Sequence, residues 1–268
     1  MSSFHVILLV FRMNLYQAAM TDRFPGRVLF ATGGGSGIGA ATARRYAAEG
    51  GRVAVADLDA DRAEAVASEL EGSIALACDV TDEESVQEAV RTAQQRLGRI
   101  DGVLNSAGYV TFAPIEELSL EDWNRMLAVH LTGTFLVCKA ALPQLRAAGG
   151  GSIVNLASST AIVGRANLAA YSAAKGGVVA FSRQLAVDAG REVRVNVLAP
   201  GSVRTPLTAP VYGESGSGAA GHSALPHSIQ NRTAEPEEIA AAACFLLSDE
   251  ASFFTAAMLV ADGGATAI

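Results

Sequence analysis

The sequence predicts an α/β fold in which about seven parallel strands form one sheet and helices cover both of its faces. Seven short apolar runs alternate along the chain with six longer helical segments. The runs are continuously apolar, which is typical of parallel strands buried on both faces of a doubly wound sheet. The 268 residues, 50% of them hydrophobic, suit one sizeable core. The predicted strands are residues 27–32, 52–57, 73–80, 102–108, 152–158, 193–200 and 257–264.

One connection between the predicted strands is long and irregular. Residues 202–233 are rich in Gly, Ser and Ala, which predicts a lid over a substrate site. We expect a single domain over residues 25–268, preceded by an N-terminal extension over residues 1–24 in which Met20 is an alternative start. The apolar run FHVILLVF in that extension is too short to span a bilayer and follows no positive segment, so we expect no export signal.

Composition argues against several classes of partner. The net charge of -7, the pI near 5.1 and the lack of a basic run argue against nucleic acid and anionic membranes, so we expect a small-molecule partner. Cys78, Cys138 and Cys244 lack metal-ligand spacing, and an odd number of cysteines in apolar surroundings predicts reduced thiols in a cytoplasmic protein. His222 and His227 have no cysteine or carboxylate at a useful spacing, so we expect no metal site.

A glycine-rich loop joins the first predicted strand to the next helix. TGGGSGIG occupies residues 32–39, and the helical sequence AATARRYAAEG follows it. Glycines let the backbone approach a pyrophosphate, whose charge meets the free N–H groups at a helix N-terminus. A glycine cluster alone is weak, but its place between strand and helix predicts a Rossmann-like dinucleotide site. The residues assigned to it are Gly33, Gly35, Ser36, Gly37, Ile38 and Gly39.

The second predicted strand ends in Asp57, about twenty residues past the glycines, where a carboxylate can accept hydrogen bonds from both ribose hydroxyls. This favours NAD over NADP, because a 2′-phosphate would place its charge against Asp57 and neither Ser36 nor Leu58 supplies a cation. In the alternative interpretation Asp57 caps the following helix, although Asp59 and Asp61 are equally available.

The stretch AAYSAAKGG, residues 169–177, carries Tyr171 and Lys175 among the smallest side chains. Residues four apart share a helical face, so both can reach one ligand. An ammonium one turn away favours the phenolate, which should lower the pKa of Tyr171 and let it exchange a proton with an alcohol. Tyr-x-x-x-Lys alone favours the alternative of a core tyrosine and a solvated lysine, which is common in any helix.

Several motifs in order resemble the short-chain dehydrogenase/reductase family, in its compact single-domain branch, over about residues 27–266. Each motif alone is unspecific, but their combination is highly specific. The resemblance implies an NAD(P)-dependent oxidoreductase acting on CH–OH donors, assembled as a homotetramer through helical faces and the C-terminal strand. The motifs are TGGGSGIG, Asp57, CDVTD at 78–82, NSAG at 105–108, Ser158 and Ser159 before YSAAK, NVLAPGSVRT at 196–205, and VADGG at 260–264.

The resemblance also implies roles for individual residues. Asp79 and Val80 would contact the adenine, and Leu58, next to Asp57, is also assigned to the cofactor site. Ser158 would hydrogen-bond the substrate oxygen, and Lys175 would hold the nicotinamide ribose besides tuning Tyr171. Residues that would line the floor beneath the cofactor or close over the nicotinamide are Asn105, Ala107, Gly108, Pro200, Gly201, Val203 and Thr205.

One position departs from the family pattern. In MLAVHLTGTF the family usually has asparagine where this chain has His130, and that residue helps to hold a water chain leading from the lysine to solvent. A histidine can relay protons because it titrates near neutrality, or its side chain can simply pack. We expect a preserved backbone role and intact catalysis.

The predicted reaction is hydride transfer between NAD(H) and a secondary alcohol or ketone, with Tyr171 as general acid and base. Two alternatives are an NADP-linked carbonyl reductase and a non-catalytic NAD(H)-binding regulatory protein. An apolar wall in the lid predicts a hydrophobic or ring-containing alcohol, and its residues are Leu207, Val211, Tyr212 and Leu225.

Overall fold

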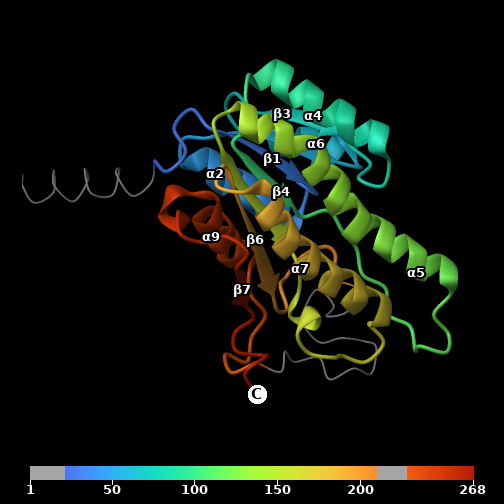
Figure 1. Cartoon of the computed structure of the whole chain (residues 1–268). Coiled ribbons are helices and arrows are strands. Elements are labelled where there is room, and N and C mark those ends of the chain that lie inside the picture. Colours follow the sequence, from blue (N-terminus) through green and yellow to red (C-terminus); the bar gives the residue numbers. More distant parts are fainter. Residues whose placement is uncertain (1–21, 210–227) are drawn as a thin grey trace, which may run out of the picture.

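The predicted parallel sheet is present in the computed structural model, which describes residues 22–209 and 228–268 (Figure 1). Seven strands pair in the order β3-β2-β1-β4-β5-β6-β7, and every pairing is parallel. The chain runs outward from β1 to β3 and then returns to place β4 beside β1. Ligands of open α/β sheets bind where the strand order reverses in this way. The strands are β1 (Val28–Thr32), β2 (Arg52–Asp57), β3 (Ile74–Ala77), β4 (Gly102–Asn105), β5 (Gly151–Leu156), β6 (Val193–Pro200) and β7 (Met258–Ala261).

Helices cover both faces of the sheet (Figure 1). The core contacts place α4, α6 and α7 on one face and α2, α3 and α9 on the other. A π-helical turn joins α5 to α6, and two short 3-10 turns follow β5 and α9. The bounds are α2 (Gly37–Ala48), α3 (Ala60–Ala67), α4 (Glu83–Leu97), α5 (Leu120–Leu127), η1 (Ala128–Thr132), α6 (Gly133–Ala147), η2 (Ser159–Ala161), α7 (Ala169–Ala189), α9 (Pro236–Leu247) and η3 (Asp249–Ala251).

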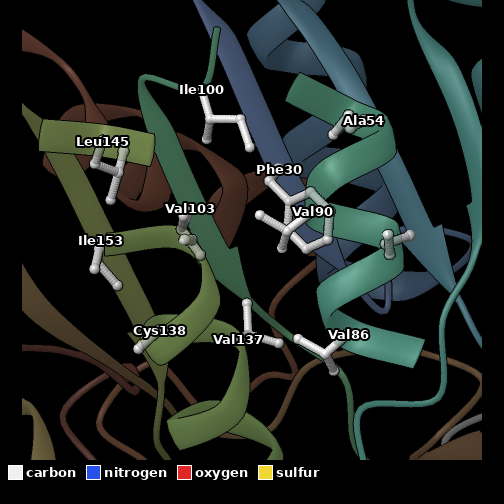
Figure 2. Close-up of a cluster of buried hydrophobic side chains, with 14 of the residues drawn as sticks. Phe30, Ala54, Val86, Val90, Ile100, Val103, Val137, Cys138, Leu145 and Ile153 are labelled. Carbon is white, nitrogen blue, oxygen red and sulfur yellow. The ribbon is translucent and has the colours of Figure 1, made fainter. Parts of the chain in front are cut away.

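The strands are continuously apolar because each face of the sheet has its own hydrophobic cluster. In β1, Phe30 belongs to the cluster under α4 and α6, whereas Leu29 and Ala31 belong to the cluster under α2 and α9. In Figure 2, Val90 of α4 lies over the ring of Phe30, and Val86 of the same helix points towards Val137 of α6. Successive side chains of a strand point to opposite faces, so burial on both faces removes the polar residues from the pattern.

Four of the observed strands end earlier than the apolar runs predicted. The extra residues lie past the carboxyl edge of the sheet, where the backbone leaves the ladder and turns into a helix or loop. Apolar composition continued through them because several still line the core or the site. The runs 73–80, 102–108, 152–158 and 257–264 end as strands at Ala77, Asn105, Leu156 and Ala261.

The helical stretch Leu120–Ala147 has the length and the mean hydropathy, 1.4, of a membrane span. Its buried residues pack against the sheet and α7, as in a core helix. The three cysteines are free and buried, in agreement with the prediction of reduced thiols. Burial raises the pKa of each thiol to about 12, so Cys78, Cys138 and Cys244 are protonated and unreactive near neutral pH.

Candidate active site

A cavity of about 520 Å³ opens at the carboxyl edge of the sheet, above the point where β1 and β4 lie side by side. Its walls come from the glycine-rich loop, the ends of β2 to β6, the helices α5 and α7, and the segment after β6. Sixteen of the predicted site residues line it together with the catalytic candidates Ser158 and His130. They are Gly33, Ser36, Gly37, Ile38, Asp57, Leu58, Asp79, Val80, Ala107, Gly108, Tyr171, Lys175, Pro200, Gly201, Val203 and Thr205.

The glycine-rich loop is built so that only glycine fits at its closest approaches. Gly33 has a φ of +60°, and a Cβ there would lie 2.8 Å from the backbone of Ala107. A Cβ on Gly39 would lie 2.1 Å from the carbonyl oxygen of Gly33. The backbone is therefore bare at the start of α2, where N–H groups face the cavity, and this cradle fits the pyrophosphate of a dinucleotide.

Asp57 lies at the end of the cavity next to this loop. Its Oδ2 accepts from the N–H of Gly35 at 2.9 Å, and its Oδ1 accepts from the N–H of Asp59 at 3.1 Å. The cap of α3 is Asp59, whose carboxylate accepts from the N–H of Arg62. The capping interpretation of Asp57 is therefore wrong, and its remaining lone pairs are available to the ribose hydroxyls of a dinucleotide.

Arg62 lines the same end of the cavity as Asp57. The sequence prediction of a site without a cation near Asp57 did not include it. The Cβ of Arg62 lies 2.7 Å from where a Cβ of Gly35 would be, and its guanidinium pairs with Asp59 at 3.0 Å. The prediction considered only Leu58 and Ser36 as neighbours of Asp57. The first turn of α3 places Arg62 next to Gly35 in the glycine-rich loop. Arg62 could have been predicted by including the first turn of the helix that follows the second strand.

Three predicted cofactor residues, two glycines and one asparagine, do not line the cavity. Gly35 donates to Asp57, and Gly39 makes room for the Gly33 carbonyl, so neither lines the wall. Asn105 is buried and donates from Nδ2 to Oδ1 of Asn155 at 2.8 Å. The expectation that Asn105 lines the cofactor floor is wrong, because the chain turns only after it and leaves its side chain inside the sheet.

The catalytic candidates Ser158, Tyr171 and Lys175 meet at the middle of the cavity. Ser158 is the second residue after β5, and its hydroxyl hydrogen-bonds to Tyr171 of α7. One turn further along α7, the Nζ of Lys175 donates to the carbonyl of Leu156 at 2.7 Å and lies 5.7 Å from the Tyr171 ring centroid. The interpretation of a solvated lysine is wrong, since Lys175 is only 6% exposed.

Burial, not charge, dominates the acidity of this pair in the protein alone. Desolvation raises the pKa of Tyr171 to about 12, and the hydrogen bond from Ser158 offsets only part of that rise. Desolvation also lowers the pKa of Lys175 to about 7. The expectation that Lys175 lowers the pKa of Tyr171 below its ordinary value is wrong here, because the same burial that brings the two together penalises both charged forms.

His130 lies in the π-helical turn η1 and is 2% exposed. Its Nε2 is 2.7 Å from the carbonyl oxygen of Tyr109, which places the ring proton on Nε2, and its ring meets Tyr171 edge to face at 5.2 Å. Burial, reinforced by the charge of Lys175, lowers the pKa of His130 to about 3. The imidazole is therefore neutral, and of the two alternatives the packing role agrees with the structure, whereas protonation near neutral pH does not.

The backbone carbonyl of His130 accepts from the hydroxyl of Thr134 at 2.7 Å, as the widened π turn allows. Two other cavity residues on or near this helix, Tyr109 and Arg125, were not predicted. Arg125 precedes His130 by five positions, which is not a helical-neighbour spacing, so no sequence signal pointed to it.

Part of the predicted lid is described. Leu207 lines the cavity, as expected of the apolar wall, and Val203 bridges to Ala234. The other predicted wall residues, Val211, Tyr212 and Leu225, and the histidines His222 and His227 lie outside the described residues, as does most of the N-terminal extension.

Comparison with known proteins supports the same site chemistry. Residues 33–266 match a family model described as enoyl-(acyl carrier protein) reductase. The chain is 47% identical over 249 residues to a D-threitol dehydrogenase of Mycolicibacterium smegmatis, covering 91% of this chain and 94% of that one. It is 40% identical to 2-(S)-hydroxypropyl-CoM dehydrogenase 3 of Xanthobacter autotrophicus, covering 93% of this chain and all of that one.

Among solved structures, levodione reductase matches with a TM-score of 0.85 and 36% identity, covering 91% of this chain and 99% of that chain. The strand order, the glycine cradle and the Ser158–Tyr171–Lys175 group occur together in a chain that these relatives match over nearly all of their length. The chain belongs to the short-chain dehydrogenase/reductase family, whose relatives named here are oxidoreductases acting on CH–OH groups.

Proposed function

We propose that this oxidoreductase moves hydride between NAD(H) and a small secondary alcohol or its ketone, with Tyr171 as general acid and base. The observation that carries the proposal is the meeting of Ser158, Tyr171 and Lys175 in one cavity with a glycine cradle that fits a dinucleotide. A nicotinamide cofactor supplies the hydride acceptor or donor. The side chains of the protein orient the substrate and transfer the proton.

Tyr171 and Ser158 hold the reacting oxygen of the substrate. With a raised pKa the Tyr171 hydroxyl is protonated near neutral pH, so in ketone reduction it donates its proton to the oxygen as hydride arrives. In alcohol oxidation Tyr171 must first release that proton to solvent; as the phenolate it then accepts the proton of the substrate hydroxyl while hydride leaves the carbon, so that one proton is released for each alcohol oxidised. Ser158 donates a hydrogen bond that favours the phenolate at that moment.

Lys175 sets the charge next to this proton transfer. Its pKa near 7 lets its protonation change over the working range, and its charged form stabilises the phenolate of Tyr171. Its hydrogen bond to the Leu156 carbonyl fixes the amine beside β5. His130 remains neutral and positions the Tyr109 backbone at the same wall.

The preference for NAD rests on Asp57, whose carboxylate would repel the 2′-phosphate of NADP. An NADP-linked reductase is the second candidate, because Arg62 stands at the same end of the cavity and could exchange Asp59 for a phosphate. The named relatives include a D-threitol dehydrogenase and a meso-2,3-butanediol dehydrogenase of Serratia marcescens, which favours a small alcohol carrying more than one polar group.

The test is the absorbance of reduced nicotinamide across a panel of secondary alcohols, diols and ketones, with NAD or NADP supplied. We expect turnover with NAD, and its loss in Tyr171→Phe with cofactor binding retained. Turnover with NADP alone would replace the first candidate by the second. No turnover of any alcohol or ketone with either cofactor would overturn the proposal.

We also propose a cytoplasmic homotetramer. Apolar side chains are exposed beside the edge strand β7, where Phe253 is 100% exposed and Phe254 41%, and along α6 and α7 at Phe135 and Val187. Exposed apolar patches of this kind are typical of subunit contacts. Light scattering after size-exclusion chromatography gives the number of subunits, and a monomeric mass at micromolar concentration would contradict the assembly.

A further inference from the structure

Arg125 is an exposed cation at the cavity wall that has neither an ion-pair partner nor a hydrogen-bond acceptor among the described residues. The described part of the cavity wall carries three basic side chains. Arg62 is paired with Asp59, and Lys175 is buried with its Nζ on the Leu156 carbonyl. Within residues 22–209 and 228–268, no carboxylate lies within ion-pair distance of Arg125, and none of its nitrogens has a hydrogen-bond acceptor.

The guanidinium of Arg125 is nevertheless held in place. Its central carbon lies 5.4 Å from the ring centroid of Tyr109, a cation–π contact. The Tyr109 ring in turn stacks on His130 at 5.8 Å, and His130 meets Tyr171 at 5.2 Å. A row of three aromatic rings therefore links the cation to the reacting hydroxyl. From Arg125 to His130 the helix advances by roughly 7 Å, which sets the scale of the separation along its axis.

The charges on the cavity wall are segregated. The three carboxylates that line it belong to Asp57, Asp59 and Asp79, and all three follow β2 or β3 at the dinucleotide end. On the stretch of wall formed by α5 and η1, Arg125 is the charged residue. Asp122, one turn earlier in α5, does not line the cavity, and its carboxylate accepts from the Ser119 hydroxyl at 2.7 Å in the helix cap.

A cation on this part of the wall favours a substrate that carries a negative charge. The protein carries a net charge of -7, so an anion approaching it is repelled at long range and needs a local cation to be retained. A guanidinium offers paired N–H donors that match a carboxylate, and an aromatic ring beneath it reduces the freedom lost on binding.

We propose that Arg125 binds a carboxylate on the substrate, so that the substrate is a hydroxy acid or keto acid whose anionic group lies well away from the reacting carbon. The inference rests on the proposed dehydrogenase function and adds the substrate class to it. Tyr171 and Ser158 hold the oxygen that reacts, and Arg125 fixes the other end of the molecule over the Tyr109 ring.

The experiment compares hydroxy acids with their primary amides, which match them in size but carry no charge. The hydroxyl carbon and the carboxyl carbon are separated by short, intermediate and long spacers, including a ring. Variants are Arg125→Leu and Arg125→Lys, with Arg96→Leu as the matched control. Arg96 lies in the last turn of α4, exposed, without an ion pair among the described residues and away from the cavity.

In the wild-type protein we expect higher kcat/KM for the acid than for the amide at the longer spacers, and a loss of this advantage as salt is raised. Arg125→Leu should lower kcat/KM for the acid about tenfold, chiefly through KM, and leave the amide nearly unchanged. Arg125→Lys should keep part of the advantage, and Arg96→Leu all of it.

Equal turnover of acid and amide by the wild type would overturn the proposal. So would an equal loss for both substrates in Arg125→Leu, which together with a changed oligomeric state would assign Arg125 to a subunit contact. Turnover of the amides and its loss in Tyr171→Phe test the dehydrogenase function separately, so the two proposals can fail independently.

Discussion

Gly108 and His130 fit together so closely that a single methyl group should destabilise the protein. A Cβ on Gly108 would lie 2.3 Å from Cε1 and 2.8 Å from Nδ1 of His130, and its three nearest neighbours all belong to this ring. The backbone of Gly108 is not in the left-handed region, so alanine adds no backbone strain. The His130 ring cannot swing away freely, because Tyr109 and Tyr171 flank it and its Nε2 bonds the Tyr109 carbonyl.

The cost of Gly108→Ala can be worked from these contacts. Overpacking of a tight core costs about 1–3 kcal/mol, and displacing the ring from its buried hydrogen bond adds roughly 1 kcal/mol. We therefore expect Gly108→Ala to lower the free energy of unfolding by about 2–4 kcal/mol. His130→Ala alone should cost a similar amount through the cavity it leaves and the lost hydrogen bond.

The double variant separates this contact from any general damage. With the ring removed, the new methyl group has space, so Gly108→Ala should cost little in the His130→Ala background, and the coupling energy should be about 2–3 kcal/mol. Urea unfolding, followed by the fluorescence of the single tryptophan, Trp123 in α5, measures all four proteins at one concentration. Additive costs, or a Gly108→Ala variant within about 0.5 kcal/mol of the wild type, would refute the reasoning.

Three further predictions concern the catalytic and cofactor residues. Tyr171→Phe should reduce kcat by about 10²–10⁴-fold with cofactor affinity unchanged, measured by nucleotide fluorescence titration, and a loss below tenfold would remove its proton-transfer role. Because the pKa of Lys175 falls from 10.5 to about 7 on folding, the unfolded chain holds its proton between these values and stability should rise with pH there. Relative to Lys175→Met, the wild type should gain at most about 1.4 kcal/mol per pH unit from pH 7 to 10 in urea unfolding, and parallel curves would contradict the shift. Asp57→Ser should move the ratio of kcat/KM for NAD over NADP at least about tenfold towards NADP, since Arg62 then faces a phosphate without a competing carboxylate, and an unchanged ratio would show that Asp57 does not select the cofactor.

The parallel sheet was predictable because strands buried on both faces have continuously apolar sequences. Every residue of β1 is buried, and the same holds for β4, so their apolar runs carry the fold directly. The glycine loop and the Tyr171–Lys175 spacing were readable for a similar reason, since each depends on neighbours in the chain.

What depends on neighbours in space was not predictable in the same way. Arg62 reaches the cavity from the first turn of α3, whereas Arg125 reaches it from the last turn of α5. Asn105 lies inside the sheet because it is the last residue of β4, and its side chain bonds to Asn155 of β5 instead of facing the cavity. The pKa of Tyr171 is raised instead of lowered because its side chain is buried. The sequence of an alanine-rich helix does not indicate how deeply one of its side chains is buried.

The hydrogen bond from Lys175 to the Leu156 carbonyl separates the positioning of the catalytic groups from the choice of substrate. It joins α7 to the last residue of β5, and Ser158 follows two residues later, so the central sheet positions both reactive hydroxyls. On the opposite wall, made by α5 and the segment after Pro200, the side chains of Arg125 and Leu207 have no hydrogen bond to a strand within the described residues. Substitutions on that wall can therefore exchange one alcohol for another while the proton-transfer geometry is inherited intact.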